Sequence, residues 1–321
     1  MEKNLSVNRL AWKLLGRLLA KPAIYGVKIE KATCGATIVD AGVRAKGGFA
    51  AGKLITEICM GGLARADILP KEYGGRTLPS IFVRTDHPII ATLGSQYAGW
   101  QISENGFFAI GSGPARALAR KPKKIYEQIG YEDKCDKAVM ILEAEKLPSK
   151  EIIERFAVDC NISPARLAII VVPTTSIAGA IQVAGRVVET GVHKLRRLGF
   201  DVSSIRYAWG QAPISPVHPD ISTAMSRMND AILYGGTAYY AVEYENEEEL
   251  KDIVQKAPSN ASSSYGKPFI EIFKDANFDF YRIDPNLFAP AIIIMNNVKT
   301  GNTFKSGEIN TEALAKSFGF I

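Results

Sequence analysis

The chain has 321 residues, of which 47% are hydrophobic, and 39 basic against 33 acidic side chains give it a net charge of +6. This length and apolar content suffice for two sizeable hydrophobic cores, so a pair of packed domains is expected. No apolar run approaches the roughly 20 residues that a membrane-spanning helix needs, and the N-terminus lacks the apolar core of a secretory signal, which predicts a cytoplasmic protein without a membrane partner.

The cysteines, histidines and basic residues argue against two kinds of site. The four cysteines lack the paired short spacing of zinc or redox motifs, and no two of the three histidines lie four residues apart, so a transition-metal site is not expected. The basic residues are spread along the chain apart from short groups at 120–124 and 194–197. Ordinary solvated surface or a small anionic ligand explains this excess without a nucleic-acid partner.

The first half of the chain alternates short helix and strand patterns. Apolar residues one helical turn apart predict an amphipathic helix over 4–20 that ends before Pro22. A stretch rich in Val, Ile and Thr over 26–43 predicts paired strands, and glycines lead from there into a helix within 46–64. Three further strands are predicted at 80–86, 89–95 and 106–113.

The second half alternates strands and helices more regularly. Strands at 137–145 and 166–175 flank a helix at 149–162, and a long amphipathic helix over 177–198 leads to a strand at 201–214. Residues 166–214 therefore predict a βαβ-like unit. The remaining elements are a helix at 219–236, a strand at 236–245, a helix at 246–257, and a final strand and hairpin that turns at 300–302.

These elements predict an α/β fold with mixed α+β elements in two domains. The charged stretch around 130–137 has few core-forming residues, so we expect an N-terminal α/β domain over 1–135 and a C-terminal α/β domain over 136–321. A discontinuous arrangement stays open, in which the last strands return to the first domain.

One glycine-rich turn is a candidate ligand site. A predicted strand runs into Gly111, Ser112, Gly113 and Pro114 and then into a helix that carries Arg116. Glycines let backbone N–H groups approach a ligand, and a helix N-terminus with a nearby arginine favours an anion. The pattern matches neither the dinucleotide fingerprint nor a Walker loop, and a simple tight turn explains it equally well.

A second candidate lies in the predicted helix over 177–198. Arg186 and Glu189 are three residues apart and so project from one face. An exposed ion pair would be the ordinary explanation. However, they are the only charged residues in the segment IQVAGRVVETGV over 181–192, which predicts partial burial. Burial would raise the pKa of the carboxylate and the arginine would lower it, which gives a tunable general base.

Three stretches together resemble the archaeal methenyltetrahydromethanopterin cyclohydrolases, and the resemblance covers the whole chain. They are GSGPARALA from residue 111, IVVPTTSIAGAIQVAGRVVETGVHKL from residue 170, and RYAWGQAPISPVHPD from residue 206. The resemblance implies a two-domain α/β subunit with a large cleft between the domains. It also implies a homotrimer that uses no metal or organic cofactor.

The resemblance further implies a substrate and a set of roles. The substrate is the methenyl cation of a pterin, 5,10-methenyltetrahydromethanopterin, which is hydrolysed reversibly to the 5-formyl derivative. In the family an arginine and a glutamate on one helix act at the reacting carbon, and the spacing RVVE transfers these roles to Arg186 and Glu189. The phosphate and carboxylates of the substrate tail would meet Gly111, Ser112, Gly113 and Arg116. A pterin- or nucleotide-binding transferase that uses the same glycine-rich turn remains the alternative.

Overall fold

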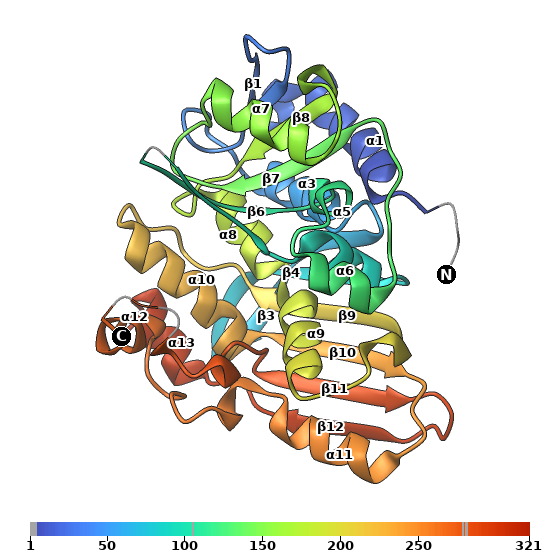
Figure 1. The fold of residues 1–321 in the computed structure, drawn as a ribbon. Helices are drawn as coiled ribbons and strands as arrows, with labels where there is room; N and C mark the ends of the chain where they lie inside the picture. Colours follow the sequence, from blue (N-terminus) through green and yellow to red (C-terminus); the bar gives the residue numbers. More distant parts are fainter. Residues whose placement is uncertain (1–4, 105, 278, 280–281) are drawn as a thin grey trace. The chain divides into compact units, whose positions relative to one another are not determined.

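The chain divides into two compact units, each with its own six-stranded sheet (Figure 1). The computed structural model describes residues 5–104, 106–277, 279 and 282–321. The first unit contains the described residues up to Arg65 together with Ile89–Gln182, and the second contains Ala66–Pro88 and Val183–Ile321. Within the described residues, no helix is both long and apolar enough to cross a membrane.

This division differs from the expected boundary between residues 135 and 136. Strand β7 (Ala138–Glu143), which follows that boundary, hydrogen-bonds to β6 (Phe107–Ser112), which precedes it, so both belong to one sheet. Each unit is made of two separate segments of the chain, but these are not the segments that the discontinuous alternative expected. The last two strands stay in the second unit, whereas an early hairpin leaves the first unit to join them.

The first sheet is mixed, and its central strands are parallel and fully buried. In spatial order it contains β1 (Lys28–Lys31), β2 (Thr37–Asp40), β8 (Leu167–Val171), β7, β6 and β5 (Trp100–Glu104). Strands β2, β8 and β7 run parallel, and the flanking pairs run antiparallel. Continuous apolar runs such as LAIIV in β8 are typical of parallel strands covered on both faces.

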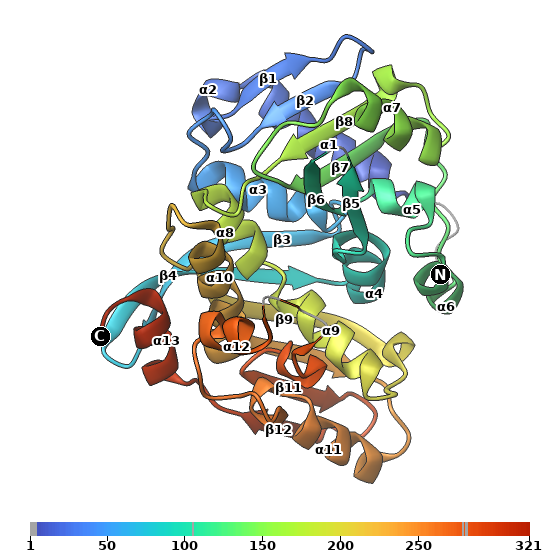
Figure 2. The ribbon, with the colours of Figure 1, turned by 60° about the vertical axis from the view of Figure 1, so that its left-hand side comes forward.

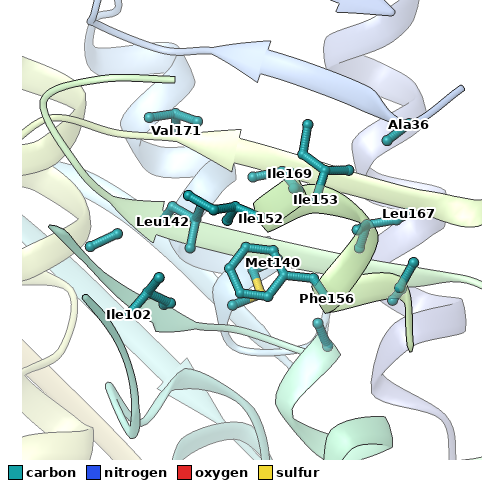
Figure 3. Close-up of a cluster of buried hydrophobic side chains, with 14 of the residues drawn as sticks. Ala36, Ile102, Met140, Leu142, Ile152, Ile153, Phe156, Leu167, Ile169 and Val171 are labelled. Atoms are coloured by element: carbon teal, nitrogen blue, oxygen red, sulfur yellow. The ribbon is translucent and has the colours of Figure 1, made fainter. Parts of the chain in front are cut away.

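Alternating side chains of these strands face two separate cores. Met140 and Leu142 of β7 pack with Ile152, Ile153 and Phe156 of α7 (Lys150–Asp159) on one face (Figure 3). On the other face, the intervening strand residues pack against α1 (Val7–Ala20) and α3 (Phe49–Cys59). The other helices in this part of the chain are α2 (Pro22–Tyr25), α4 (Pro88–Ala91), α5 (Ala115–Ala119), α6 (Lys123–Ile129) and α8 (Ile177–Ala184).

The second sheet combines an early hairpin with the C-terminal half of the chain (Figure 2). Its order is β12 (Thr303–Gly307), β11 (Ile292–Asn297), β10 (Thr237–Val242), β9 (Ile205–Pro213), β4 (Arg76–Thr85) and β3 (Ala64–Tyr73). Strands β10 and β11 pair in parallel, and the crossover connection between them contains helix α11 (Glu247–Lys256), as in a βαβ unit. The other described pairs of this sheet, β9 with β10, β11 with β12 and β4 with β9, are antiparallel.

The helices of the second unit form two groups. Helix α9 (Val187–Arg197) lies on β9 and β10, and α11 lies on β11 and β12 (Figure 1). Helices α10 (Ile221–Gly235), α12 (Phe269–Asp275) and α13 (Thr311–Phe318) pack together in a separate core. That core also takes in Tyr73 and Leu78 from the early hairpin.

Most predicted elements are confirmed, but three predictions are wrong. Residues 89–95 form α4 and a π-helical turn (Thr92–Gln96) instead of a strand, because buried side chains from elsewhere bind the carbonyls of that turn. The predicted helix over 177–198 is broken into α8 and α9. The expected βαβ unit over 166–214 is not formed, since β8 lies in the first sheet and β9 in the second.

Asp230 is a buried carboxylic acid that joins two helices of the second unit. It is fully buried in α10, and both of its carboxylate oxygens accept the N–H of Phe269 at the start of α12, at 3.0 and 3.1 Å. Burial raises the pKa of Asp230 to about 7, although hydrogen bonds from Ser317 and Phe269 oppose the shift. The ionised form is therefore disfavoured in the folded protein.

This raised pKa predicts that Asp230 makes the folded protein less stable as the pH rises from 4 to 7. In that window the unfolded chain has ionised Asp230, while the folded chain still holds the proton, so the loss can reach about 4 kcal/mol. Asp230→Asn keeps an oxygen acceptor for Phe269 but cannot ionise. We expect its free energy of unfolding, measured by denaturant titration, to overtake that of the wild type as the pH approaches 8. Parallel pH profiles for the two proteins would contradict this expectation.

Candidate functional site

Arg186 and Glu189 lie together at the start of helix α9. Arg186 is the N-cap residue, outside the regular helix, with φ −82° and ψ 1°, and its carbonyl accepts the N–H of Thr190 at 2.8 Å. Glu189 occupies the first turn, where the helix dipole favours a negative charge. The break after α8 thus places the two residues one turn apart at a helix N-terminus, although the sequence predicts them in the middle of a long helix.

Both side chains are buried, with 8% of Arg186 and 7% of Glu189 exposed. The ordinary alternative, a solvent-exposed ion pair, does not fit this burial. A carboxylate removed from bulk water has a pKa that depends strongly on its immediate neighbours, which is the property that a general base requires.

Glycines allow the first turn of α9 to approach the second sheet closely. A Cβ atom on Gly210 of β9 would lie 2.7 Å from Val187 and 2.9 Å from Val188. A Cβ atom on Gly191 would lie 2.0 Å from the hydroxyl oxygen of Tyr240 in β10. Larger side chains at either glycine would push the helix, and Glu189 with it, away from the sheet.

Two later residues of α9, His193 and Lys194, have lowered pKa values. Burial, helped by Arg197 and Arg196, lowers the pKa of His193 to about 4, so this side chain one turn after Glu189 is neutral at physiological pH. Burial lowers the pKa of Lys194 to about 8, against the opposing effect of Asp284. The ammonium of Lys194 donates to the backbone and side-chain oxygens of Asn286, both at 3.0 Å.

The glycine-rich turn lies in the first unit and is packed on all sides. Gly111, in β6, packs against Met140 and Trp100, and a Cβ atom there would lie 2.5 Å from Met140. Ser112 is 1% exposed, with its hydroxyl oxygen 3.4 Å from the sulfur of Cys59. Gly113 has a positive φ of 89°, and its N–H donates to the carbonyl of Ser95 at 2.9 Å. That N–H is therefore not directed at a ligand.

Arg116 is also buried, with none of its surface exposed. Its guanidinium donates to the carbonyls of Leu93 at 3.3 Å and Ser95 at 3.1 Å, and lies 5.1 Å from the ring centroid of Tyr97. The hydroxyl of Tyr126 donates to the carbonyl between them, that of Gly94. Arg116 thus has a packing role at the π-helical turn through its Nη1 donor, while the anion contact expected from the sequence stays a prediction.

A group of polar residues that the sequence analysis did not select lies at the carboxyl end of the parallel strands. Asp40 at the end of β2 accepts the N–H groups of residues 42–45. Beyond β8, the hydroxyl of Thr174 donates to Glu143 at the end of β7, and that of Thr175 donates to Glu145.

These residues occupy the usual ligand position of an open α/β sheet. Helix α7 follows β7 on one face and α8 follows β8 on the other, so β7 and β8 form a topological switch point. The sequence signal was the change from an apolar run to PTTS at 173–176.

No metal centre emerges from the donor groups. Across the described part of the chain, there is no cluster of three or more His, Cys, Asp or Glu side chains that could hold a metal ion. Arg186 and Glu189 come together in the second unit, whereas Gly111, Ser112, Gly113 and Arg116 come together in the first. The candidate base and the glycine-rich turn therefore belong to different units.

Comparison with known proteins assigns the family. The model of the family described as "Cyclohydrolase (MCH)" matches residues 6–318. The chain belongs to the MCH cyclohydrolase family. Among its relatives, the methenyltetrahydromethanopterin cyclohydrolases of Methanothermobacter marburgensis and Methanocaldococcus jannaschii are 47% and 46% identical to it, each over 98% of this chain and 99% of the relative. The one from Methanoculleus marisnigri is 47% identical over 99% of this chain and all of the relative.

The packing role of Arg116 in this MCH cyclohydrolase can be tested directly. Arg116→Met removes the donor to two buried carbonyls, so we expect the free energy of unfolding to fall by roughly 2–4 kcal/mol. The exposed Arg120 nearby provides the matched control, and Arg120→Met should change the stability by less than about 0.5 kcal/mol. Inorganic phosphate should shift the melting temperature of wild type and Arg116→Met equally. A phosphate-induced shift that is lost only in Arg116→Met would restore the anion-binding role.

Proposed function

We propose that this chain is a methenyltetrahydromethanopterin cyclohydrolase in the one-carbon metabolism of methanogenic archaea. It reversibly hydrolyses the methenyl bridge of 5,10-methenyltetrahydromethanopterin to 5-formyltetrahydromethanopterin. The observation behind this proposal is the family match over residues 6–318, together with near-complete coverage of relatives that have this name.

The chemistry explains why one carboxylate suffices. The bridging carbon is an amidinium carbon flanked by two nitrogens and already positive, so water needs a base more than an electrophilic catalyst. We assign that base to Glu189. It accepts a proton as water attacks, and the adduct is a tetrahedral carbinol. Glu189 then donates this proton to N10 as the C–N10 bond breaks. The carbinol hydroxyl loses its own proton, the one released overall, and the formyl group remains on N5. One proton is released overall, because a cation and water give a neutral product.

We assign to Arg186 the role of orienting the carboxylate of Glu189 and of keeping it ionised. Its guanidinium lies one turn away, and both side chains are buried, so its positive charge is close to the carboxylate in a site that has little contact with water. Its planar group of donors can also fix the orientation of the carboxylate, which the point charge of a lysine cannot do. Both residues are therefore expected at the reacting carbon.

The remaining assignments concern cofactors, location and assembly. We propose that the enzyme uses no metal or organic cofactor, since the reaction proceeds with a base alone. All four cysteines are free thiols, which fits the reducing cytoplasm. No nucleic-acid partner is proposed. The transferase alternative rested on an open glycine-rich turn, and the packing of Gly111 and Gly113 removes the observation behind it.

The first experiment follows the absorbance of the methenyl chromophore after chelator-treated protein is added to methenyltetrahydromethanopterin. Wild type should remove the chromophore rapidly, whereas Glu189→Gln should lower kcat by at least about 100-fold, the usual contribution of a general base. The melting temperature of the variant serves as the folding control. An active Glu189→Gln would preserve the function and reject the base. No activity in the wild type would reject the function.

Arg186→Lys is the companion variant in the same assay. It retains a positive charge but loses the bidentate geometry, so we expect kcat to fall less than in Glu189→Gln while the base remains. If kcat of Arg186→Lys has the same value and the same pH dependence as that of the wild type, a positive charge at position 186 is sufficient for activity.

We also propose that the subunits assemble as a homotrimer, as the family resemblance implies. Sedimentation equilibrium of the purified protein should give a mass near three times the 34.9 kDa of the chain. A mass that stays at one or two subunits at every concentration would contradict this assembly.

A further inference from the structure

Tyr240 lies directly behind the helical turn that presents Glu189. It is fully buried in the middle of β10, which hydrogen-bonds to β9 on one side and to β11 on the other. The backbone of Tyr240 is thus fixed from both sides, opposite Ala208 and Met295. A side chain anchored in this way can serve as a rigid stop for the helix above it.

The hydroxyl of Tyr240 reaches into the backbone of α9 around Glu189. It donates to the carbonyl of Val188 at 2.8 Å, and the N–H of Val192 lies close enough to hydrogen-bond the phenolic oxygen. These two groups are four residues apart and so lie one helical turn from each other on α9. The phenol oxygen therefore contacts the helix backbone on both sides of the turn that follows Glu189.

Gly191 allows the phenol of Tyr240 to approach the backbone of α9 this closely. A Cβ atom at position 191 would lie 2.0 Å from the hydroxyl oxygen of Tyr240 and 3.1 Å from its ring carbon Cζ. The sequence therefore has glycine, the amino acid without a side chain, at the position where the phenol contacts the helix. The hydroxyl and the glycine form one complementary contact.

The phenol also lies within the electrostatic field of Glu189. Burial raises the pKa of Tyr240 well above its usual value, and the negative charge of Glu189 raises it further. The phenol consequently stays protonated at any pH at which the enzyme works. Tyr240 thus keeps its donor, while Glu189 does the proton transfer.

We propose that Tyr240 is a positioning residue, whose hydroxyl between Val188 and Val192 sets the place of the Glu189 carboxylate relative to the reacting carbon. This inference rests on the proposed function. Without the hydroxyl, the carbonyl of Val188 loses its side-chain donor and α9 loses the contact that fixes its distance from the sheet, so the turn that carries Glu189 shifts. A displacement of this kind affects proton transfer more than substrate binding, so kcat falls while KM stays close to the wild-type value.

The test combines Tyr240→Phe, Gly191→Ala and the double variant. Tyr240→Phe should lower kcat by about 10- to 100-fold, since displacement of a reacting group by about 1 Å has effects of this size. Gly191→Ala should also lower kcat, because its methyl group collides with the hydroxyl. The double variant should recover part of the kcat lost in Gly191→Ala, because the colliding oxygen is gone and only the contacts with Cζ at 3.1 Å and with Ile293 at 3.3 Å remain.

Tyr234→Phe is the matched control. Tyr234 belongs to the same unit, is fully buried, and donates its hydroxyl to the carbonyl of Lys267, so its loss should lower the melting temperature much as Tyr240→Phe does. Its kcat should remain at the wild-type level. Equal losses of kcat in the two variants would show that Tyr240 is only structural and would overturn the inference.

The remaining outcomes separate this inference from the proposed function. An inactive wild type would reject the function, and the positioning role would fall with it. An active wild type, an inactive Glu189→Gln and an unchanged Tyr240→Phe would preserve the function and reject the positioning role. If Tyr240→Phe does not fold, Gly191→Ala disturbs the same contact from the helix side, and an unchanged kcat in that variant would overturn the inference.

Discussion

The close approach of helix α9 to the second sheet is the constraint on which the candidate site depends. Val187 and Val188 fit over Gly210, and Gly191 receives the hydroxyl of Tyr240. A helix held so near a sheet removes much of its first turn from water. Glu189 in that turn is 7% exposed.

The two buried arginines show how the same side chain serves different purposes. Arg116 in the first unit is directed at backbone carbonyls of a π-helical turn, to which its Nη1 donates, and at the faces of tyrosine rings. Arg186 is the N-cap residue of the helix that also carries Glu189, the residue proposed as the base. Both arginines lie close to glycines in the sequence. The hydrogen bonds of Arg116 to backbone carbonyls give it a structural role.

Polar groups also anchor the first unit. Asn8 at the start of α1 donates to Pro114 and Asp133, and its side-chain oxygen accepts the N–H of Val139 in β7. One side chain thereby connects a helix, a turn and the central sheet. Buried hydrogen-bonded groups of this kind specify a single arrangement of elements that apolar packing alone would leave less defined.

The sequence by itself determined most helices and strands, because apolar periodicity and β-branched runs are local properties. It also determined that Arg186 and Glu189 lie one helical turn apart, a spacing that survives the helix break, and it determined the family, because the match extends over nearly the whole chain. Only the tertiary structure decided which unit each strand joins, since the transfer of β3 and β4 to the second sheet depends on pairing between residues far apart in sequence. It also decided that Gly111 and Gly113 pack against neighbouring strands and that Tyr240 meets Gly191, because such contacts exist only where distant segments come within a few ångströms of each other.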